Sequence, residues 1–395
     1  MRASPRVLFV DQSGQLGGAE LMLADVAARF GAAGTVLLFQ DGPFREHLAA
    51  RGIPVRVIGG GPLAVTKAGG LGSWLRVLPA FTRLVRETWQ TAEGPDVLYA
   101  NTAKALIVGA VVAAGRRKPL VFHLHDLVSP DHFSRLNRWL LVRVASTFAR
   151  TIIANSEATR DAFIAAGGRA ERHVVIYNGF DPGRFSPGAI APRIRGEFPV
   201  GAKPLAVVIG RLTPWKGQHV LLAAARALPE LHVLVVGGAL FTPEDRAYEA
   251  QLRREAAEPE LRGRVHFAGH RDDIVPFYHA ADVVVHCSVA PEPFGRVVVE
   301  AMLAGRPVLA ADAGGVREIL QEPGTGELVP PNDASALAEA LRRLLADPDR
   351  ARRMAAAGQA MARRRFGLDG VLDATEAAVD SARHRSSDSS TTNPT

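Results

Sequence analysis

Two successive series of short apolar, β-branched runs alternate with helix-length segments, and this pattern constrains the fold of the 395-residue chain most. The strands expected in the first series are 7–10, 35–39, 55–57, 96–100, 120–125, 151–154 and 174–177. After a segment rich in Gly, Pro and Arg, the second series follows at 205–210, 232–237, 265–269, 282–287 and 307–311. Continuous apolar strands between helices are typical of parallel sheets covered on both faces. The sequence therefore predicts an α/β protein with two Rossmann-like domains facing an interdomain cleft.

The domain limits follow from this pattern. We predict an N-terminal domain at 1–185, a C-terminal domain at 186–366, a last helix at 367–384 and a disordered tail at 385–395. The tail ends in SSDSSTTNPT, which has no apolar residue with which to form a core. Whether the last helix crosses back to the N-terminal domain stays open.

The composition of the chain limits the cellular compartment and the classes of partner that we expect. No apolar stretch approaches the roughly 18–20 residues that span a bilayer. The single cysteine, Cys287, excludes an intramolecular disulfide and fits a reducing cytoplasm, where we expect it in a buried strand. Residues 1–185 hold 22 Lys and Arg against 14 Asp and Glu, while the remainder holds 25 against 26. The basic half suggests a polyanionic partner or an anionic membrane surface, with a plain solvated face as the alternative. We expect a cytoplasmic protein, at the membrane face or free of it, and no nucleic acid partner.

Two carboxylates eight positions apart, Glu292 and Glu300, bracket the stretch EPFGRVVVE. The apolar residues AMLAG that follow indicate a helix packing inward, so the two acids at its entrance do not serve the core. Helix N-termini bind phosphate through free N–H groups, and carboxylates accept hydrogen bonds from sugar hydroxyls. The combination suggests a ligand with both phosphate and sugar, such as a nucleotide-sugar.

Cations and glycines follow two other strands. Arg211 ends the strand 205–210, and Lys216 begins the next helix, so the two could clamp a diphosphate or simply be surface cations. In the first domain, Gly17 and Gly18 follow the first strand, where their N–H groups can approach a phosphate. A dinucleotide-binding turn is the rival, but its G-x-G-x-x-G pattern is absent.

Two histidines, His123 and His125, stand two residues apart on an expected strand and so point to the same side. The H-x-H pair could bind a metal, but no third ligand motif accompanies it. We therefore favour a single functional histidine, His125, at the strand end, with His123 as a core residue. No metal is expected.

The chain resembles the family-4 retaining glycosyltransferases, which have the GT-B fold, from about residue 5 to residue 382. The motifs that carry the resemblance appear in family order: LGGAE (16–20), HLHD (123–126), ANSEATRDAF (154–163), VIYNGFDPGRFSP (175–187), GRLTPWKG (210–217), HFAGHRDDI (266–274), PEPFGRVVVEAMLAGRPVLA (291–310), AGGVREIL (313–320) and GTGELVPPND (324–333). Any one of them is only suggestive, whereas all nine in order are a strong signal.

The resemblance implies roles for the donor-side residues. Glu300 would accept hydrogen bonds from the ribose, and Glu292 would face hydroxyls of the transferred sugar, aided by backbone amides around Phe294 and Gly295. Arg211 and Lys216 would neutralise the diphosphate leaving group.

It implies further roles around the reacting sugar. Gly17 and Gly18 would close over the phosphates, and His125 would lie beside the reacting sugar. The base would rest near His270. The catalytic residues would then be His125, Glu292, Arg211 and Lys216.

A retaining enzyme could use a carboxylate nucleophile, as retaining glycosidases do. Nothing in this chain compels that role, and the resemblance assigns Glu292 to hydroxyl binding. We favour same-face attack, in which the departing diphosphate helps to deprotonate the acceptor. No cofactor and no metal ion would then be needed, since the nucleotide-diphosphate-sugar is a substrate. The alternatives are a sugar-nucleotide epimerase of the same fold, a Rossmann oxidoreductase and a non-catalytic nucleotide-sugar-binding protein.

We assign acceptor binding to the basic N-terminal domain. The expected acceptor is a glycan or lipid-linked saccharide of cell-surface polysaccharide or glycolipid synthesis. The segment 73–89 places Phe81 and Val85 at helical spacing among arginines such as Arg83. It could lie on an anionic membrane, or pack on the sheet as an ordinary amphipathic helix.

Overall fold

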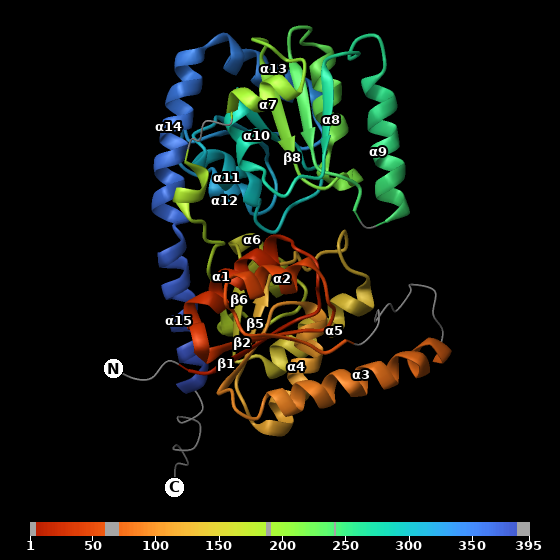
Figure 1. The fold of residues 1–395 in the computed structure, drawn as a ribbon, viewed down its shortest axis with the longest axis vertical. Coiled ribbons are helices and arrows are strands. Elements are labelled where there is room, and N and C mark those ends of the chain that lie inside the picture. Colours follow the sequence, from red (N-terminus) through yellow and green to blue (C-terminus); the bar gives the residue numbers. More distant parts are fainter. Residues whose placement is uncertain (1–4, 60–70, 187–190, 241, 385–395) are drawn as a thin grey trace. The chain divides into compact units, whose positions relative to one another are not determined.

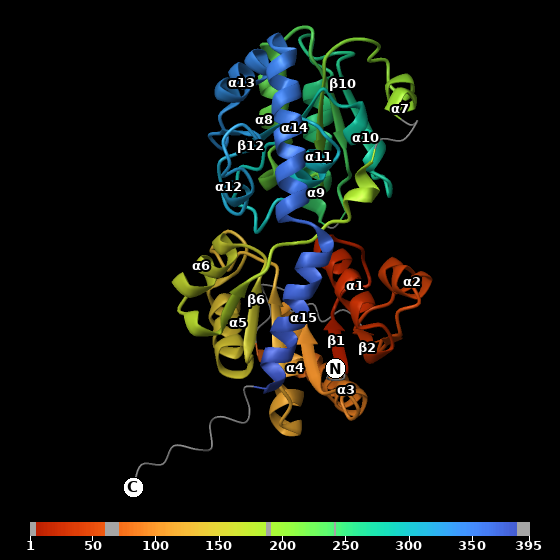
Figure 2. The ribbon, with the colours of Figure 1, turned by 90° about the vertical axis from the view of Figure 1, so that its left-hand side faces the viewer.

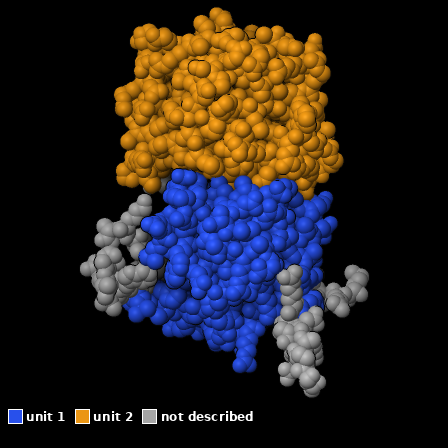
Figure 3. Space-filling model, turned by 180° about the vertical axis from the view of Figure 1, so that it is seen from behind, with its two compact units in different colours: residues 1–179, 369–395 blue, residues 180–368 orange. Residues whose placement is uncertain are grey.

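The computed structural model describes residues 5–59, 71–186, 191–240 and 242–384, with side chains at 71–77 and 191–193 excepted. It divides into two compact units (Figure 3). The first comprises Met1–Gly179 and Asp369–Thr395, and the second comprises Phe180–Leu368. The first boundary therefore follows residue 179 and not residue 185. Residues 180–185 belong with the second unit because the rings of Phe180 and Phe185 pack there, against Phe294 and Tyr278.

The first unit contains a seven-stranded sheet in the order β3-β2-β1-β4-β5-β6-β7. Its strands are β1 (Val7–Asp11), β2 (Gly34–Leu38), β3 (Val55–Val57), β4 (Val97–Ala100), β5 (Leu120–Leu124), β6 (Thr151–Ala154) and β7 (His173–Val175), all paired in parallel. Its helices are α1 (Gly18–Phe30), α2 (Pro43–Ala50), α3 (Leu71–Thr91), α4 (Ala103–Arg116), α5 (Arg135–Phe148), α6 (Glu157–Ala165) and α15 (Leu368–His384). The seven strands expected from the sequence are all present.

Helices cover both faces of this sheet, as its apolar strands predict. On one face Leu8 of β1 is fully buried in a core that Leu106 of α4 and Leu141 of α5 complete. The next residue, Phe9, points to the other face, where its ring meets Phe30 of α1 at 5.6 Å. This alternation fixes the register of β1 and hence the place where the strand ends at Asp11.

The segment expected at 73–89 forms most of α3, which packs beside α4 (Figure 1). Leu84 is buried, and Phe81 and Val85 pack against the core, while Leu78 is exposed. Residues 71–77 of the helix lie outside the described side chains. The described part of α3 thus uses its apolar stripe for packing. Across the described residues, no helix is long and apolar enough to cross a membrane.

The second unit contains a six-stranded parallel sheet in the order β10-β9-β8-β11-β12-β13. Its strands are β8 (Leu205–Ile209), β9 (His232–Val236), β10 (Val265–Gly269), β11 (Val283–His286), β12 (Val308–Ala311) and β13 (Glu327–Val329). Its helices are α7 (Ala191–Glu197), α8 (Gln218–Arg226), α9 (Pro243–Ala256), α10 (Val275–Ala280), α11 (Arg296–Leu303), α12 (Val316–Ile319), α13 (Ala334–Ala346) and α14 (Pro348–Arg365). The edge strand β13 was not expected, because its three residues carry no alternation that the sequence alone would reveal.

Two layers of helices enclose this sheet as well. Figure 1 shows α8 and α9 on one side of it and α10, α11 and α12 on the other. Leu221 of α8, Leu252 of α9 and Leu341 of α13 form one core with alternate strand residues. On the other face α11 packs on β11 and β12, and α14 lies along α11 (Figure 2). The sheet is buried on both sides, so polar groups gather where its strands end.

The C-terminal helix α15 packs in the first unit from Asp369 onward. Arg29 of α1 pairs with Asp373 at 2.5 Å and with Glu376 at 3.1 Å. Near the end of the helix, Arg150 donates to the carbonyl oxygen of Ala382 at 3.2 Å. These contacts hold α15 against the first unit, which also contains the N-terminal strand β1.

Candidate functional site

In the second unit, the loops after β8 and β11 approach each other closely at the carboxyl edge of the sheet. Gly217 adopts a left-handed conformation, with φ of +68°, between the 3₁₀ turn Pro214–Lys216 and α8. A Cβ atom at this position would lie 2.0 Å from the carbonyl oxygen of Cys287. The amide of Val289 also donates to the carbonyl oxygen of Trp215 at 2.9 Å. The tight approach brings Lys216 beside the residues that follow β11. Cys287 itself is buried and directly follows that strand.

Gly217→Ala is expected to destabilise the second unit by about 3 kcal/mol or more, because the new methyl group adds a steric clash to an unfavourable φ. Gly263→Ala provides the matched control. Its φ is +78°, but a Cβ atom there meets no described atom within 4 Å, so we expect a loss of only about 1 kcal/mol. Chemical denaturation of the two variants measures both values. Equal losses would show that the approach of the two loops is not as close as described.

Lys216 and Glu292 form a largely buried ion pair at this edge. The Lys216 Nζ lies 2.5 Å from Glu292 Oε1, with 16% and 8% of the two side chains exposed. His286, the last residue of β11, places its Nε2 2.7 Å from the same oxygen, and the Ser288 hydroxyl donates to it as well. All three contacts are to Oε1. Within the described part of the chain, Oε2 therefore keeps its lone pairs for another donor.

The surroundings of Glu292 keep it ionised. Burial by itself would raise the pKa of this carboxyl, but the charge of Lys216 and the bond from His286 hold the pKa well below its usual value. A buried carboxylate with these partners stays anionic across the physiological pH range. It can accept a hydrogen bond, and it has no proton to donate.

The backbone of Glu292 is also held by the loop after β12. Its carbonyl oxygen accepts from the amide of Gly315 at 2.9 Å, and Glu292 forms an isolated bridge with Gly314. A Cβ atom at Gly314 would lie 2.2 Å from that carbonyl oxygen. The AGG sequence (313–315) therefore has a direct structural role, since it lets one loop lie against another and fixes the position of the carboxylate.

Arg211 and Lys216 come together around one aromatic ring. The Lys216 Nζ lies 4.6 Å from the centre of the Trp215 ring, and the Arg211 Cζ lies 6.0 Å from it. Arg211 is exposed, and its carbonyl oxygen accepts from the side chain of Gln218 at 2.8 Å. The two cations expected to clamp a diphosphate are thus neighbours, one buried with Glu292 and one facing solvent.

Glu300, on α11, is buried with partners of its own. The Tyr278 hydroxyl donates to Glu300 Oε2 at 2.8 Å, and the Arg296 Nε lies 3.5 Å from Oε1. Burial first, and then the charge of Glu300, raise the pKa of Tyr278 well above its usual value, so the hydroxyl keeps its proton and donates. Arg296 in turn lies over the Phe180 ring at 4.4 Å.

The residues between the two glutamates serve mainly to shape the loop. The side chain of Phe294 is buried, and its ring lies 5.6 Å from that of Phe366. Gly295 has a φ of +101° and caps the start of α11. His270 follows β10, two strands away from β8; its side chain is exposed, and its Nε2 lies 3.6 Å from Asp272 Oδ1.

In the first unit, His125 belongs to a hydrogen-bonded chain that begins at a buried acid. Asp11 ends β1, Asn101 follows β4, and His125 follows β5. The Asn101 side-chain nitrogen donates to Asp11 Oδ2 at 2.6 Å, and its oxygen lies 2.8 Å from the His125 Nε2. Because an ionised Asp11 only accepts, the amide must turn its oxygen to the histidine, which then donates from Nε2. These two hydrogen bonds therefore fix both the ring orientation and the tautomer of His125.

His123 lies one pleat deeper, as its alternation with His125 predicts. The two rings lie 3.8 Å apart, and the Tyr99 hydroxyl lies 2.6 Å from the His123 Nδ1. Burial lowers the pKa of His123 well below its usual value, so this ring is neutral. No group of three or more His, Cys, Asp or Glu side chains suited to a metal ion occurs among the described residues. The histidine pair therefore has no described third ligand.

The glycine-rich turn opens α1. Gly17 precedes the helix and Gly18 is its first residue. Glu20, in the first turn, folds back so that its Oε2 lies 2.6 Å from where a Gly17 Cβ atom would be. Burial and the charge of Asp11 raise the pKa of Glu20 to about 7. Burial also raises the pKa of Asp11 to about 6.

Glu20→Gln is expected to stabilise the protein near pH 8 and to lose that advantage in acid. When the folded-state pKa of a carboxyl group is raised, the folded protein takes up the proton first and gains stability as pH falls from about 8 to about 4. The variant lacks this gain. Because Glu20 is only half-buried, we expect about 1 kcal/mol near pH 8. Thermal unfolding across this pH range measures it, with the exposed Glu93→Gln as control. Parallel curves for Glu20→Gln and the wild type would contradict the assignment.

Matches to known proteins appear over both halves of the chain. Residues 16–184 match the model of Glycosyltransferase Family 4, and residues 192–361 match that of Glycosyl transferases group 1. A GDP-mannose-dependent alpha-(1-6)-phosphatidylinositol monomannoside mannosyltransferase of Mycobacterium tuberculosis is 33% identical over 291 residues, which are 70% of this chain and 70% of that protein. The chain belongs to glycosyltransferase family 4.

Further matches to this glycosyltransferase include a relative by sequence and a solved structure. A D-inositol 3-phosphate glycosyltransferase of Nocardia farcinica is 31% identical over 78% of this chain and 71% of its own. The crystal structure of Anabaena Alr3699/HepE in complex with UDP-glucose superposes with a TM-score of 0.86 and 41% identity, covering 95% of this chain and 99% of that one. The glycosyltransferase therefore has the GT-B fold that the resemblance implied.

Several residues of the candidate site were not found from the sequence. His286 and Ser288 hold Glu292, Tyr278 holds Glu300, and Asn101 holds His125. A signal for Asn101 was present, because it follows the strand 96–100 just as His125 ends the strand 120–125. Neighbouring parallel strands bring such residues to one edge. No comparable signal exists for Tyr278, which reaches Glu300 from another helix.

Proposed function

We propose that the glycosyltransferase moves a hexose from a nucleotide-diphosphate-sugar to a hydroxyl acceptor with retention of anomeric configuration. The observation that carries the proposal is the buried Lys216–Glu292 pair, with Arg211 beside the same tryptophan. Two cations suit a diphosphate, and a carboxylate with an oxygen left for another donor suits a sugar hydroxyl.

Each donor-side residue has a proposed task. Lys216 and Arg211 neutralise the charge that develops on the diphosphate, which lowers the barrier because these cations are already in place. Glu292 Oε2 accepts from a hydroxyl of the sugar that moves, and Glu300 accepts from the ribose. The amides near Phe294 and Gly295 add donors, and the nucleotide base rests near His270.

The first unit supplies the remaining groups. Gly17 and Gly18 lie at the start of a 13-residue helix, where free N–H groups favour an anion. His125 is assigned to the reacting sugar, and its Nε2–H is already bonded to Asn101. Any group of the sugar would therefore meet the other edge of the ring or the backbone around it.

In the proposed reaction the bond between the anomeric carbon and the diphosphate oxygen breaks, and the acceptor oxygen bonds to the same carbon on the same face. The acceptor proton passes to the departing diphosphate. Glu292 is not the nucleophile in this scheme, because Lys216, His286 and Ser288 hold its Oε1. Its Oε2 is assigned to a hydroxyl of the sugar that moves. No metal ion takes part in this scheme, and activity that is unchanged by EDTA is the expected result.

The donor nucleotide and sugar are proposed from two relatives. HepE was crystallised with UDP-glucose, and the mycobacterial relative is named as GDP-mannose-dependent. A thermal-shift screen of UDP-glucose, GDP-mannose and further nucleotide-sugars identifies the donor, since a ligand that binds only the folded state raises its stability. We expect one nucleotide class to raise Tm clearly above the others. A panel with no shift would overturn the proposal.

The acceptor is proposed to be a glycan or lipid-linked saccharide in cell-surface polysaccharide or glycolipid synthesis, at the cytoplasmic face of the membrane. Names of the relatives support this class, among them the mannosyltransferases of phosphatidylinositol glycolipids. Product analysis by proton NMR, followed during the reaction, tests retention from the first anomer that appears. An isomerised donor in the absence of any acceptor would favour the epimerase alternative instead.

A further inference from the structure

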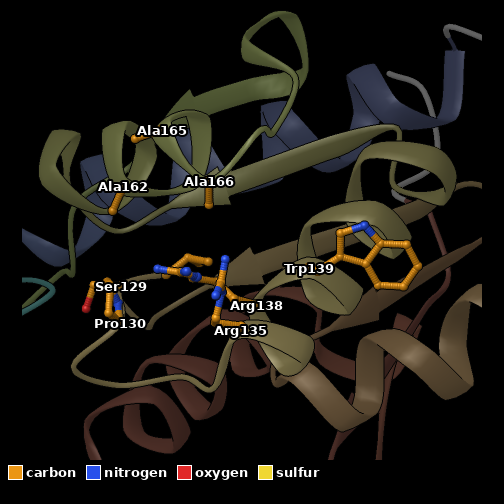
Figure 4. Close-up of a pocket in the computed structure, with 9 residues that line it drawn as sticks. Ser129, Pro130, Arg135, Arg138, Trp139, Ala162, Ala165 and Ala166 are labelled. Atoms are coloured by element: carbon orange, nitrogen blue, oxygen red, sulfur yellow. The ribbon is translucent and has the colours of Figure 1, made fainter.

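The first unit has a pocket of about 440 Å³ on the surface between α5 and α6 (Figure 4). The segment that leaves His125 forms one wall through Ser129 and Pro130. Three alanines of the α6 region, at positions 162, 165 and 166, form the opposite wall. Alanines at this spacing lie on one helical face, and their small side chains leave the space that the pocket occupies. The pocket lining thus begins at Val128, three residues after the histidine assigned to the reacting sugar.

Two arginines of α5 lie side by side in this pocket. Arg135 and Arg138 are three residues apart, so they share a face of the helix, and Figure 4 shows their nitrogens together between the two walls. Neither guanidinium forms an ion pair or a hydrogen bond with any other described residue. The first turn of α5 adds the positive end of the helix. Two unpaired guanidinium groups at a helix start suit a phosphate, which they can bind in bidentate fashion.

Apolar side chains surround these charges on the outer face of the same helix. Leu136 is 62% exposed and Trp139 is 60% exposed, next to Arg143, and α5 contains no acidic residue. An exposed Leu and Trp among arginines are typical of a helix at a lipid interface, where the ring sits at headgroup level. A small soluble phosphate would leave both apolar side chains in water. A phosphate attached to an apolar chain would cover them.

We propose that this pocket, lined by Arg135, Arg138 and Trp139, binds the phosphate of an amphiphilic molecule, with its apolar chain along Leu136 and Trp139. The inference rests on the proposed function, because such a molecule would be a lipid-linked acceptor presented to the segment that follows His125. It also places the contact with an anionic lipid surface on α5. In α3, Phe81, Leu84 and Val85 pack against the core instead, and its exposed Leu78 and Trp89 are less exposed than Leu136 and Trp139 of α5.

Vesicle binding of the full chain without donor tests this inference. We would measure co-sedimentation with phosphatidylcholine vesicles with and without phosphatidic acid, whose headgroup is a phosphate monoester. Arg135→Ala combined with Arg138→Ala is expected to weaken binding to the anionic vesicles by about 30-fold, since each arginine near such a surface contributes about fivefold to the affinity. The control is Arg352→Ala combined with Arg353→Ala in α14, which removes the same charge from the second unit and should change binding less than about threefold.

Two further arms distinguish the source of the phosphate. Trp139→Ala should weaken vesicle binding, while glycerol 3-phosphate should compete only weakly with vesicles. Full competition by glycerol 3-phosphate, or an unchanged Trp139→Ala variant, would overturn the amphiphile. Equal losses in the α5 and α14 double variants would overturn the pocket, because net charge alone would then explain the binding. The donor thermal shift, measured on the same variants, should stay unchanged; its absence in the wild type would instead contradict the proposed function.

Discussion

Glu292→Ala is expected to abolish sugar transfer, with kcat/KM falling by about 10³-fold or more. The change removes the carboxylate that accepts a hydrogen bond from the moving sugar. It also leaves Lys216 buried beside a cavity without its counter-charge. Loss of one preorganised electrostatic group in a closed site costs about 10²–10³ in kcat, and the unpaired lysine adds to this. Initial rates with the donor that the screen identifies measure the effect.

Glu292→Gln separates charge from shape in the same position. The amide keeps the size of the side chain but cannot present an anion to Lys216, His286 and Ser288 together. We expect a loss of activity nearly as large as that of the alanine variant, and a lower Tm, because one partner of a buried pair has been neutralised. Circular dichroism at the assay temperature shows whether each variant is folded. Near-normal activity in either folded variant would remove Glu292 from the site.

Lys216→Met is expected to lower kcat by about 10²–10³-fold, because the diphosphate then leaves without its buried cation. The variant should also acquire a pH dependence. The charge of Lys216 is the main influence that lowers the pKa of Glu292 against its burial. Without it the pKa rises, so Glu292 takes up a proton and the residual activity falls as pH drops from about 8 to about 5.

The wild type should not share that loss from Glu292, which stays ionised over the whole range. Lys203→Met is the matched control, since Lys203 pairs with Glu230 at the exposed surface of the same unit. Its activity should remain within about twofold of the wild type. A Lys216→Met variant with wild-type kcat would show that the diphosphate does not depend on this lysine.

The sequence predicted the two sheets because strand periodicity is a local property. Twelve runs of apolar residues became twelve strands, while β13, only three residues long at a sheet edge, left no such pattern. The boundary near residue 180 depends on which core receives Phe180 and Phe185. Spacing along the chain does not contain that information.

The candidate site divides in the same way. The site residues lie just after a strand or in the first turns of the helix that follows it, so their place at a sheet edge could be predicted. They are Arg211, Lys216, His125, Glu292 and Glu300. Their partners could not, because Tyr278 and Glu300 meet only after α10 and α11 have packed. The resemblance to the family named the acids, whereas the pairing of Glu292 with Lys216 is a fact of three-dimensional structure.

The central claim is that Glu292 binds the sugar of the donor and Glu300 binds its ribose. Calorimetric titration with the donor and with its nucleotide tests this claim most directly. UDP-glucose and UDP serve as the pair, or GDP-mannose and GDP if the screen selects them. We predict that Glu300→Gln weakens the sugar-nucleotide and the nucleotide by the same factor, about tenfold, through the ribose. Glu292→Gln should weaken only the sugar-nucleotide. Wild-type affinity of both variants for both ligands would contradict the account.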